Sequence, residues 1–190
     1  MKKYKMTLIE ILGVVILIAI LAAIGVGSYV YASNSSKEKA TSATISRMEN
    51  ALAKLNDGKI SKLRTTENTA SNGFVTVRLD ISGKKVYFGN TAVGKDNKEQ
   101  QEAFQIFTAA LSGENLESIT DSEGYLIDGW LQKIYIRYPG KFNKGNFDII
   151  SAGSDGVFGE NGSASDIPAD MEKYKDEEGD SICDDLANFL

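Results

Sequence analysis

Histidine is absent from this chain of 190 residues, and cysteine occurs once, at Cys183. The lack of histidine excludes a His-dependent catalytic triad and a His-ligated metal centre. A single cysteine cannot form an intramolecular disulfide or a multi-thiolate zinc motif. Cys183 is therefore predicted to be a small buried apolar residue, with an intermolecular disulfide as the alternative. The sequence shows no nucleophile and base at motif spacing and no phosphate-binding loop, so we expect no enzyme. Pairs of carboxylates could still act as a catalytic acid and base, so a membrane-anchored enzyme remains an alternative class of protein.

Charge is almost missing from residues 7–27, a run of membrane-compatible residues with one acidic side chain, Glu10. A membrane-spanning helix needs about 20 predominantly apolar residues. An ionisable group inside such a helix is costly, so Glu10 is predicted to have a partner. Lys2, Lys3 and Lys5 precede the run, and the positive-inside rule predicts that they stay in the cytoplasm.

Two simpler interpretations explain part of this N-terminal segment: a secretory signal peptide and a plain signal anchor. A secretory signal peptide shares the basic start, but its apolar stretch is shorter and a small-residue cleavage site follows it. A plain signal anchor fits both the length and the charge. It leaves Glu10 unexplained unless the carboxylate extends toward the lipid headgroups. The anchor therefore remains open from the residues alone.

Residues 28–56 are predicted to continue the helix with a different character. Apolar residues recur at spacings of three and four and form one stripe opposite a polar face. The stripe consists of Ile45, Met48, Ala51, Leu52 and Leu55. Its amphipathic pattern predicts that this half lies on a globular domain, whereas the apolar first half must pack against copies of itself outside a membrane. Asp57 and Gly58 are predicted to end the helix.

The remaining residues predict a mixed domain. Residues 74–81 alternate apolar and polar side chains, and residues 85–88 follow after Ser82 and Gly83, which indicates a β-hairpin. Residues 96–111 have the pattern of a capped helix with an apolar stripe, ended by Gly113. Two further strands are expected around residues 134–138 and 147–151, joined by a polar hairpin loop. The acidic tail, residues 172–185, is expected to be a solvated face or a short helix that carries apolar residues inward, namely Ile182, Leu186 and Leu190. A second calcium site in this tail is the alternative.

A glycine-rich, oxygen-rich segment spans residues 151–167. Gly153, Gly156, Gly159 and Gly162 recur every three residues, with acidic, amide and hydroxyl side chains between them. Calcium binds six to eight oxygen atoms from carboxylates, amides and carbonyls. A calcium site is therefore one interpretation of this composition. A solvated surface loop is the other.

The opening Met6-Thr7-Leu8-Ile9-Glu10 and the apolar residues behind it resemble the signature of type IV pilins and pseudopilins. The resemblance implies that a prepilin peptidase cuts between Lys5 and Met6 and that the new amine of Met6 is methylated. It also implies that Glu10 neutralises the N-terminal amine of a neighbouring subunit, because opposite charges in a low dielectric offset each other's desolvation. The family usually has glycine before the cut, where this chain has Lys5.

Three later segments resemble the C-terminal half of the major pseudopilin of type II secretion systems. They are Asp128-Gly129-Trp130, Tyr138-Pro139-Gly140 and the stretch from Asp148 to Gly156. In that family the glycine-rich loop holds a calcium ion that orders the C-terminal sheet. The matching positions imply an oxygen ligand set with Asp155, Asp166 and the carbonyl of Ala152 as main ligands and Glu160, Asn161 and Ser163 as secondary candidates.

The resemblance implies an α+β chain with the type IV pilin fold. A long N-terminal helix would pack on a small antiparallel β-sheet, with an additional helix and a calcium-binding C-terminal loop. The expected divisions are a leader at 1–5, a transmembrane or filament-core half of the helix at 6–27, an amphipathic half at 28–57, and a globular α/β pilin domain at 58–190 with the calcium loop at 151–167.

The function implied is that of a structural subunit, a major pilin or pseudopilin, of a type IV pilus-like or type II secretion filament. Its expected partners are further copies of itself in a helical homopolymer, the inner membrane before assembly, the prepilin peptidase, and an assembly platform with its ATPase. The precursor would be a single-pass bacterial inner membrane protein with a cytoplasmic N-terminus, and the filament would be periplasmic or extracellular.

Two further considerations bound this function. Removal of the leader and its three lysines would leave 18 basic and 26 acidic residues, a net charge of −8, which disfavours nucleic acid as the main partner. The alternative function is a monomeric calcium-binding surface module held by an uncleaved signal anchor. The two functions differ in whether the chain begins at Met1 or at Met6 in its final form.

Overall fold

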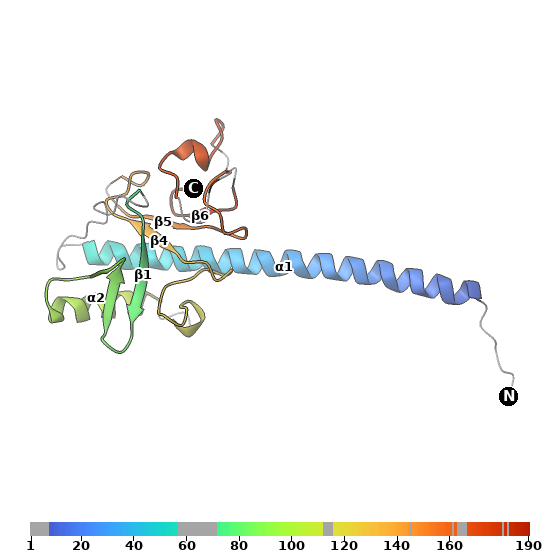
Figure 1. The fold of residues 1–190 in the computed structure, drawn as a ribbon, viewed down its shortest axis with the longest axis horizontal. Helices are drawn as coiled ribbons and strands as arrows, with labels where there is room; N and C mark the ends of the chain where they lie inside the picture. Colours follow the sequence, from blue (N-terminus) through green and yellow to red (C-terminus); the bar gives the residue numbers. More distant parts are fainter. Residues whose placement is uncertain are drawn as a thin grey trace. The chain divides into compact units, whose positions relative to one another are not determined.

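The computed structural model describes residues 8–56, 72–111, 116–144, 146–160, 162, 167–179, 181 and 183–190. The helices are α1 (Leu8–Asn56), α2 (Asn97–Leu111) and the 3-10 turns η2 (Leu116–Ser118) and η3 (Met171–Lys173). The strands are β1 (Val75–Asp80), β2 (Lys85–Phe88), β3 (Thr91–Ala92), β4 (Tyr135–Arg137), β5 (Asp148–Ser151) and β6 (Leu186–Ala187). They form one antiparallel sheet in the order β3-β2-β1-β4-β5-β6 (Figure 1). A long helix, a second helix and this sheet confirm the predicted α+β pilin fold.

The chain divides into two compact units, Met1–Ser36 and Lys37–Leu190. In the first unit, the described part of α1 exposes its apolar side chains. An 18-residue window of this helix has a mean hydropathy of 2.9, and none of it is buried within the chain. By length and composition, α1 is therefore able to cross a membrane. This agrees with the predicted anchor at the N-terminus.

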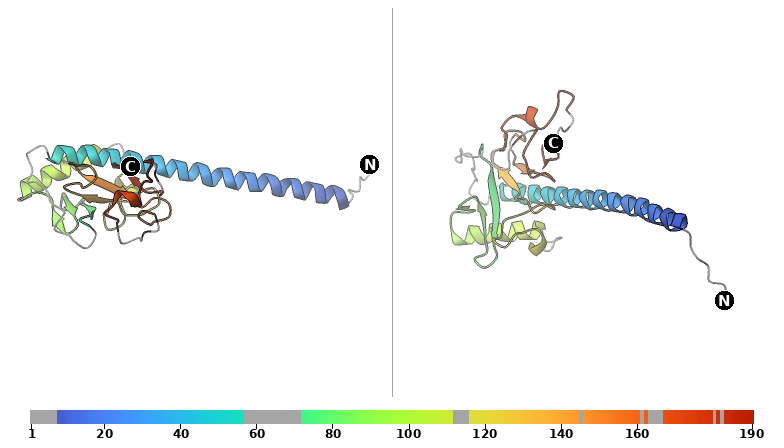
Figure 2. Two further views of the ribbon diagram at one scale, coloured as in Figure 1. Left: turned by 90° about the horizontal axis from the view of Figure 1, so that it is seen from above. Right: turned by 45° about the vertical axis from the view of Figure 1, so that its right-hand side comes forward.

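In the second unit, the last turns of α1 are amphipathic. All five residues of the predicted stripe, Ile45, Met48, Ala51, Leu52 and Leu55, are buried. They share one hydrophobic core with the sheet and α2. Figures 1 and 2 show the C-terminal turns of α1 beside the sheet. Hydroxyl groups in this half bond back to the helix, since Thr41 donates to Lys37 O over 2.9 Å and Thr44 to Ala40 O over 3.1 Å. These bonds satisfy polar side chains at positions that become buried.

The β1–β2 hairpin and α2 follow the predicted pattern with one exception. Val75, Val77 and Leu79 are buried on the core side of β1. Ile81 was expected to join them, but it is 58% exposed because β1 ends at Asp80 and the chain turns there. The Asp96 carboxylate caps α2 by accepting hydrogen bonds from Lys98 N and Glu99 N at 2.9 Å each, as the sequence pattern predicted.

The C-terminal segment covers the second face of the sheet at its β4–β5–β6 end. Ile149 belongs to the core with α1 and α2, whereas its neighbour Ile150 belongs to a second apolar cluster. The members of this second cluster come largely from the C-terminal part of the chain: Phe74, Ile150, Ala152, Phe158, Ile167 and Tyr174. The predicted short helix near Leu186 was wrong, because Leu186 lies in strand β6 and pairs with Ser151. The neighbouring Ile182 lies outside the described residues.

The end of the chain is fixed to two elements through one side chain. The amide of Asn188 donates to Phe147 O over 2.9 Å and to the Glu49 carboxylate over 3.2 Å. Its oxygen accepts from Ile149 N over 2.8 Å. Asn188 therefore joins the C-terminal segment to β5 and to α1 at once.

The Asp128-Gly129-Trp130 motif holds a turn against α1. One oxygen of Asp128 accepts from Trp130 N and Gln132 N at 2.8 and 2.9 Å. Gly129 N donates to the Thr41 hydroxyl over 2.9 Å, and a Cβ at Gly129 would lie 2.7 Å from the Cβ of Lys37. Only glycine lets this turn approach the helix so closely.

Candidate cation site

The segment after β5 turns tightly through three glycines. Gly153, Gly156 and Gly159 have φ values of 63°, 72° and 68°. A Cβ at Gly153 would collide with the backbone carbonyl of Asp184. The left-handed backbone and this close approach explain why glycine occupies the position. They also show that the glycine-rich loop and the C-terminal acidic residues are neighbours.

Strand pairing brings these two segments together. Ser151 at the end of β5 pairs with Leu186 at the start of β6, and the two strands are antiparallel. The residues just after β5 must therefore lie beside the residues just before β6, which are Asp184 and Asp185. The acidic tail was predicted to be a solvated face. Its residues Asp184 and Asp185 instead border the glycine-rich loop.

Asp184 binds the backbone of this loop. Its Oδ2 accepts from Ser154 N over 2.7 Å, from Ser154 Oγ over 2.6 Å and from Asp155 N over 3.1 Å. Burial alone would raise the pKa of Asp184, but these hydrogen bonds outweigh it and hold the pKa below its ordinary value. Asp184 is therefore an ionised cap of the loop.

Asp185 is in a different environment. Its side chain is 4% exposed, and Oδ2 accepts from Gly159 N over 2.6 Å. Its Oδ1 is buried and has no hydrogen-bond partner among the residues that the structure describes. Burial, with the nearby charges of Asp184 and Asp155, raises the pKa of Asp185 to about 6. A buried carboxylate with one unsatisfied oxygen is an environment that a cation would stabilise.

The predicted ligands are only partly within the described residues. Ala152 is buried in the second apolar cluster, whereas the side chains of Asp155 and Glu160 are exposed. The backbone N–H of Glu160 donates to Lys173 O over 2.8 Å, and Asp155 Oδ1 accepts from Val157 N over 2.8 Å. The remaining predicted positions, Asn161, Ser163 and Asp166, lie outside the described residues.

Asp184 and Asp185 were not predicted to border the glycine-rich loop, although a second calcium site in the acidic tail was an alternative. The available signal was an acidic pair directly before the apolar Leu186, a pattern that can place carboxylates at a strand end. Among the described residues, no group of three or more Asp, Glu, Cys or His side chains has the arrangement of a metal site. Asp185 still fits a hard cation, because its free oxygen is the donor type that calcium prefers. Within the described part of the chain, further ligands would have to include backbone or amide oxygen atoms.

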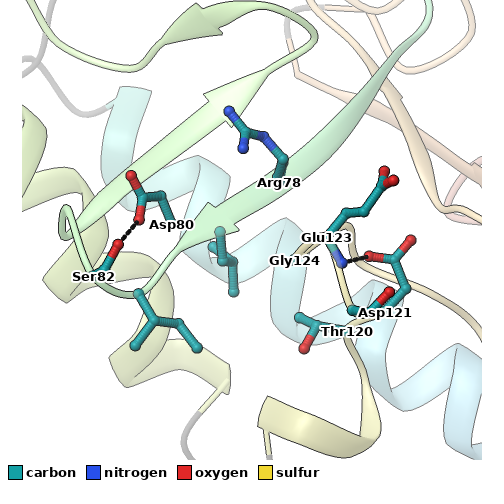
Figure 3. A pocket seen from close by; sticks show the side chains of 10 residues that line it. Arg78, Asp80, Ser82, Thr120, Asp121, Glu123 and Gly124 are labelled. Carbon is teal, nitrogen blue, oxygen red and sulfur yellow. Dashed lines mark hydrogen bonds between the residues drawn. The ribbon is translucent and has the colours of Figure 1, made fainter.

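A separate groove of about 530 Å³ lies where the end of β1 faces the segment from Thr120 to Gly124 (Figure 3). Two of its carboxylates, those of Asp80 and Asp121, accept hydrogen bonds from residues of the same turn. Asp80 accepts from Ser82 Oγ over 2.8 Å, and Asp121 accepts from Glu123 N over 2.9 Å. Hydrogen bonds, first from Gly83 N and then from Ser82, hold the pKa of Asp80 below its ordinary value. The Asp80 carboxylate is therefore held in its ionised form by its own turn.

At the other end of the chain, Glu10 lies in the first turn of α1 and its side chain is exposed. The predicted processing residues Lys5 and Met6 lie outside the described residues. The pairing of Glu10 with a neighbouring amine concerns a second copy of the chain, so it stays a prediction.

Residues 96–170 match the family model described as type II secretion system (T2SS), protein G. The resemblance to the pseudopilins of type II secretion is confirmed. The match runs from the cap of α2 through β4, β5 and the glycine-rich loop, and so includes the Asp128 motif. It ends before Asp184 and Asp185. No curated protein and no solved structure matches the chain.

The match makes residues 96–170 similar to protein G of type II secretion, a pseudopilin. A type II secretion pseudopilin is a structural subunit, which agrees with the expectation of no enzyme. An apolar N-terminal helix fits a membrane anchor, and a pseudopilin fits the inner membrane and periplasm.

Proposed function

We propose that this chain is a pseudopilin that forms the repeating subunit of a helical filament. Before assembly, the subunit is held as a single-span protein in the inner membrane, from which it is extracted into the filament. The observation that carries the proposal is the first half of α1, which is apolar on every side and buries none of its most apolar window within its own chain. Outside a membrane, such a surface must pack against other apolar surfaces. Copies of the same helix supply them, and the pilin fold of residues 37–190 forms the outer layer.

Processing and pairing at the N-terminus are part of the same proposal. A prepilin peptidase cuts between Lys5 and Met6, and Met6 is methylated. Glu10 of one subunit then pairs with the new amine of another during assembly on the membrane platform and its ATPase. An ion pair inside an apolar filament core offsets charges that would each be costly alone.

Mass spectrometry of the protein isolated from the producing cells, combined with electron microscopy, tests this function. We expect a chain that begins at N-methylated Met6 and filaments that bind antibody against residues 37–190. Long surface fibres would indicate a pilus, and short periplasmic ones a pseudopilus. An intact Met1 together with monomeric protein would support the membrane-anchored calcium-binding module instead.

We further propose that calcium stabilises the C-terminal half of the sheet. Asp185 and Asp155 would supply carboxylate oxygens, and Ala152 a carbonyl oxygen. From the resemblance, Asp166 remains a main candidate, and Glu160, Asn161 and Ser163 remain secondary candidates. The bound ion would neutralise carboxylates that raise one another's proton affinity and would fasten the loop after β5 to the start of β6.

Thermal unfolding of the full chain in detergent tests the calcium proposal. At a calcium concentration of about 100 times Kd, binding adds about 2.7 kcal/mol, so the chelator EGTA is expected to lower Tm by roughly 5–10 °C. In Asp185→Asn, this difference should largely disappear. In EGTA this variant should be at least as stable as the wild type, because a buried unpaired charge has been removed.

The matched control is Glu177→Gln, which removes an exposed carboxylate from the same C-terminal segment. It should keep the full calcium response. A wild-type Tm that does not change on chelation would contradict the calcium proposal and leave the filament proposal untouched.

A further inference from the structure

Two aromatic residues mark the end of the apolar part of α1. Tyr29 and Tyr31 are 75% and 79% exposed, more than most of the apolar residues before them. No charged residue occurs between Glu10 and Lys37 in the sequence. The tyrosines thus stand between an uncharged apolar run and the first charges of the polar half. They are the first aromatic residues of the described helix.

The spacing of these tyrosines matches the thickness of a bilayer. Tyr29 follows Leu8 by 21 residues, which at 1.5 Å per residue is about 31 Å along the axis. The hydrocarbon core of a bilayer is about 30 Å thick. Leu8 is the first aliphatic residue after the polar Thr7. If Leu8 lies at one boundary of that core, Tyr29 lies at the other.

Their arrangement around the axis is also informative. Residues two apart on an α-helix differ by about 200°, so Tyr29 and Tyr31 lie on nearly opposite sides of α1. A packing stripe would place its aromatic residues on one face, at spacings of three or four. Tyrosine has an apolar ring and a polar hydroxyl, and it is enriched where a membrane meets water. Two tyrosines on opposite sides of the helix fit a membrane interface, which surrounds the helix evenly.

We propose that Tyr29 and Tyr31 form a collar in the lipid headgroup layer on the non-cytoplasmic side, which fixes the depth of the stored subunit in the membrane. This inference rests on the proposed storage of the subunit as a single-span protein. The partner is the lipid interface itself, recognised through two aromatic rings and two hydroxyl groups. The collar releases the helix only when the subunit is extracted.

The collar has a consequence for the other end of the span. Glu10 precedes Tyr29 by 19 residues, or about 28 Å along the helix. With the collar in the far headgroup layer, Glu10 lies near the cytoplasmic boundary of the hydrocarbon core, where its carboxylate can reach the headgroups. Met6 lies only four residues earlier in the sequence. The collar therefore sets the depth at which the bond between Lys5 and Met6 meets its peptidase.

The test measures helix depth directly in the full, uncleaved chain. A nitroxide is attached to Ala22→Cys in a Cys183→Ser background, and the protein is reconstituted into phosphatidylcholine vesicles. Collision rates with oxygen and with a water-soluble nickel chelate then report the depth of the label. In Tyr29→Leu/Tyr31→Leu the apolar run is longer, so the label should move about 3 Å toward the bilayer centre, a slide of roughly two residues.

The matched control is Tyr29→Trp/Tyr31→Trp, which keeps two interfacial aromatic residues. Its label should stay at the wild-type depth. Equal depths in the wild type and the leucine variant would overturn the collar, and so would a tryptophan variant that shifts as far as the leucine variant. Since no cleavage or filament is needed for this measurement, its failure can be told apart from failure of the proposed function.

Discussion

Replacing Arg137 by methionine is expected to lower the free energy of unfolding by about 3–5 kcal/mol, because it leaves a buried carboxylate without its counter-charge. Arg137 donates through Nε to Asp148 Oδ2 over 2.9 Å and through Nη2 to the same oxygen. The two side chains are 4% and 0% exposed. Urea unfolding of the full chain in detergent, followed by fluorescence of Trp130, measures the change.

The surroundings of this pair explain the size of the effect. The guanidinium carbon lies 4.4 Å from the ring centroid of Phe74 and 4.8 Å from that of Phe142, so Arg137 is held between two aromatic rings. Asp148 also accepts hydrogen bonds from backbone N–H groups of the β4–β5 loop, among them Lys141 N at 2.8 Å and Asn143 N at 2.7 Å. The pair therefore connects strand β4, strand β5 and the loop between them.

The control for this experiment is an exposed ion pair in the same region. Lys141 Nζ lies 3.4 Å from Asp170, and their side chains are 56% and 78% exposed. Lys141→Met should cost less than about 1 kcal/mol, since solvent screens such pairs. Equal effects of the two methionine substitutions would show that burial does not determine the contribution of Arg137.

Replacing Glu10 by glutamine should abolish filaments while membrane insertion stays intact. Glutamine keeps the size of the side chain but cannot neutralise the amine of a neighbouring subunit. Breaking a buried ion pair costs about 3–5 kcal/mol, which corresponds to a loss of roughly 100- to 4,000-fold in the association constant of subunits. Filament yield by electron microscopy and resistance of the membrane fraction to alkaline extraction measure the two properties.

Glu38→Gln provides the control on the same helix, because Glu38 is an exposed carboxylate in the polar half of α1. It should form normal filaments. Normal filaments from Glu10→Gln would refute the pairing role of Glu10. Loss of membrane insertion in that variant would show that the carboxylate acts before assembly.

The helices and strands in which a hydrophobic pattern repeats several times could be predicted from the sequence. A local pattern repeats several times in each of three elements. They are the stripe from Ile45 to Leu55, the helix α2 that ends at Leu111, and strand β1. Burial of one face follows directly from such repetition. The error at Ile81 arose at a strand end, where the alternation continues in the sequence but the backbone turns away.

The arrangement of residues around the candidate cation site could be predicted only in part, because it depends on pairing between distant residues. Strand β6 has two residues, which is too few to show a period. Its pairing with β5 nevertheless determines that Asp184 and Asp185 lie beside the glycine-rich loop. The family resemblance identified the loop and Asp155. It could not identify the acidic pair, which follows the matched residues.

The attachment of the last residues determines where this protein can carry a label. Asn188 holds the chain end on β5 and α1, and the ring of the neighbouring Phe189 packs at a tilt against Phe142, with 4.6 Å between the ring centroids. A purification tag or fluorophore fused after Leu190 would compete with these contacts. The turn from Asp176 to Gly179 is exposed and closes through its own backbone hydrogen bond of 3.1 Å. A short epitope inserted there would let the subunit be imaged in cells with its terminal segment in place.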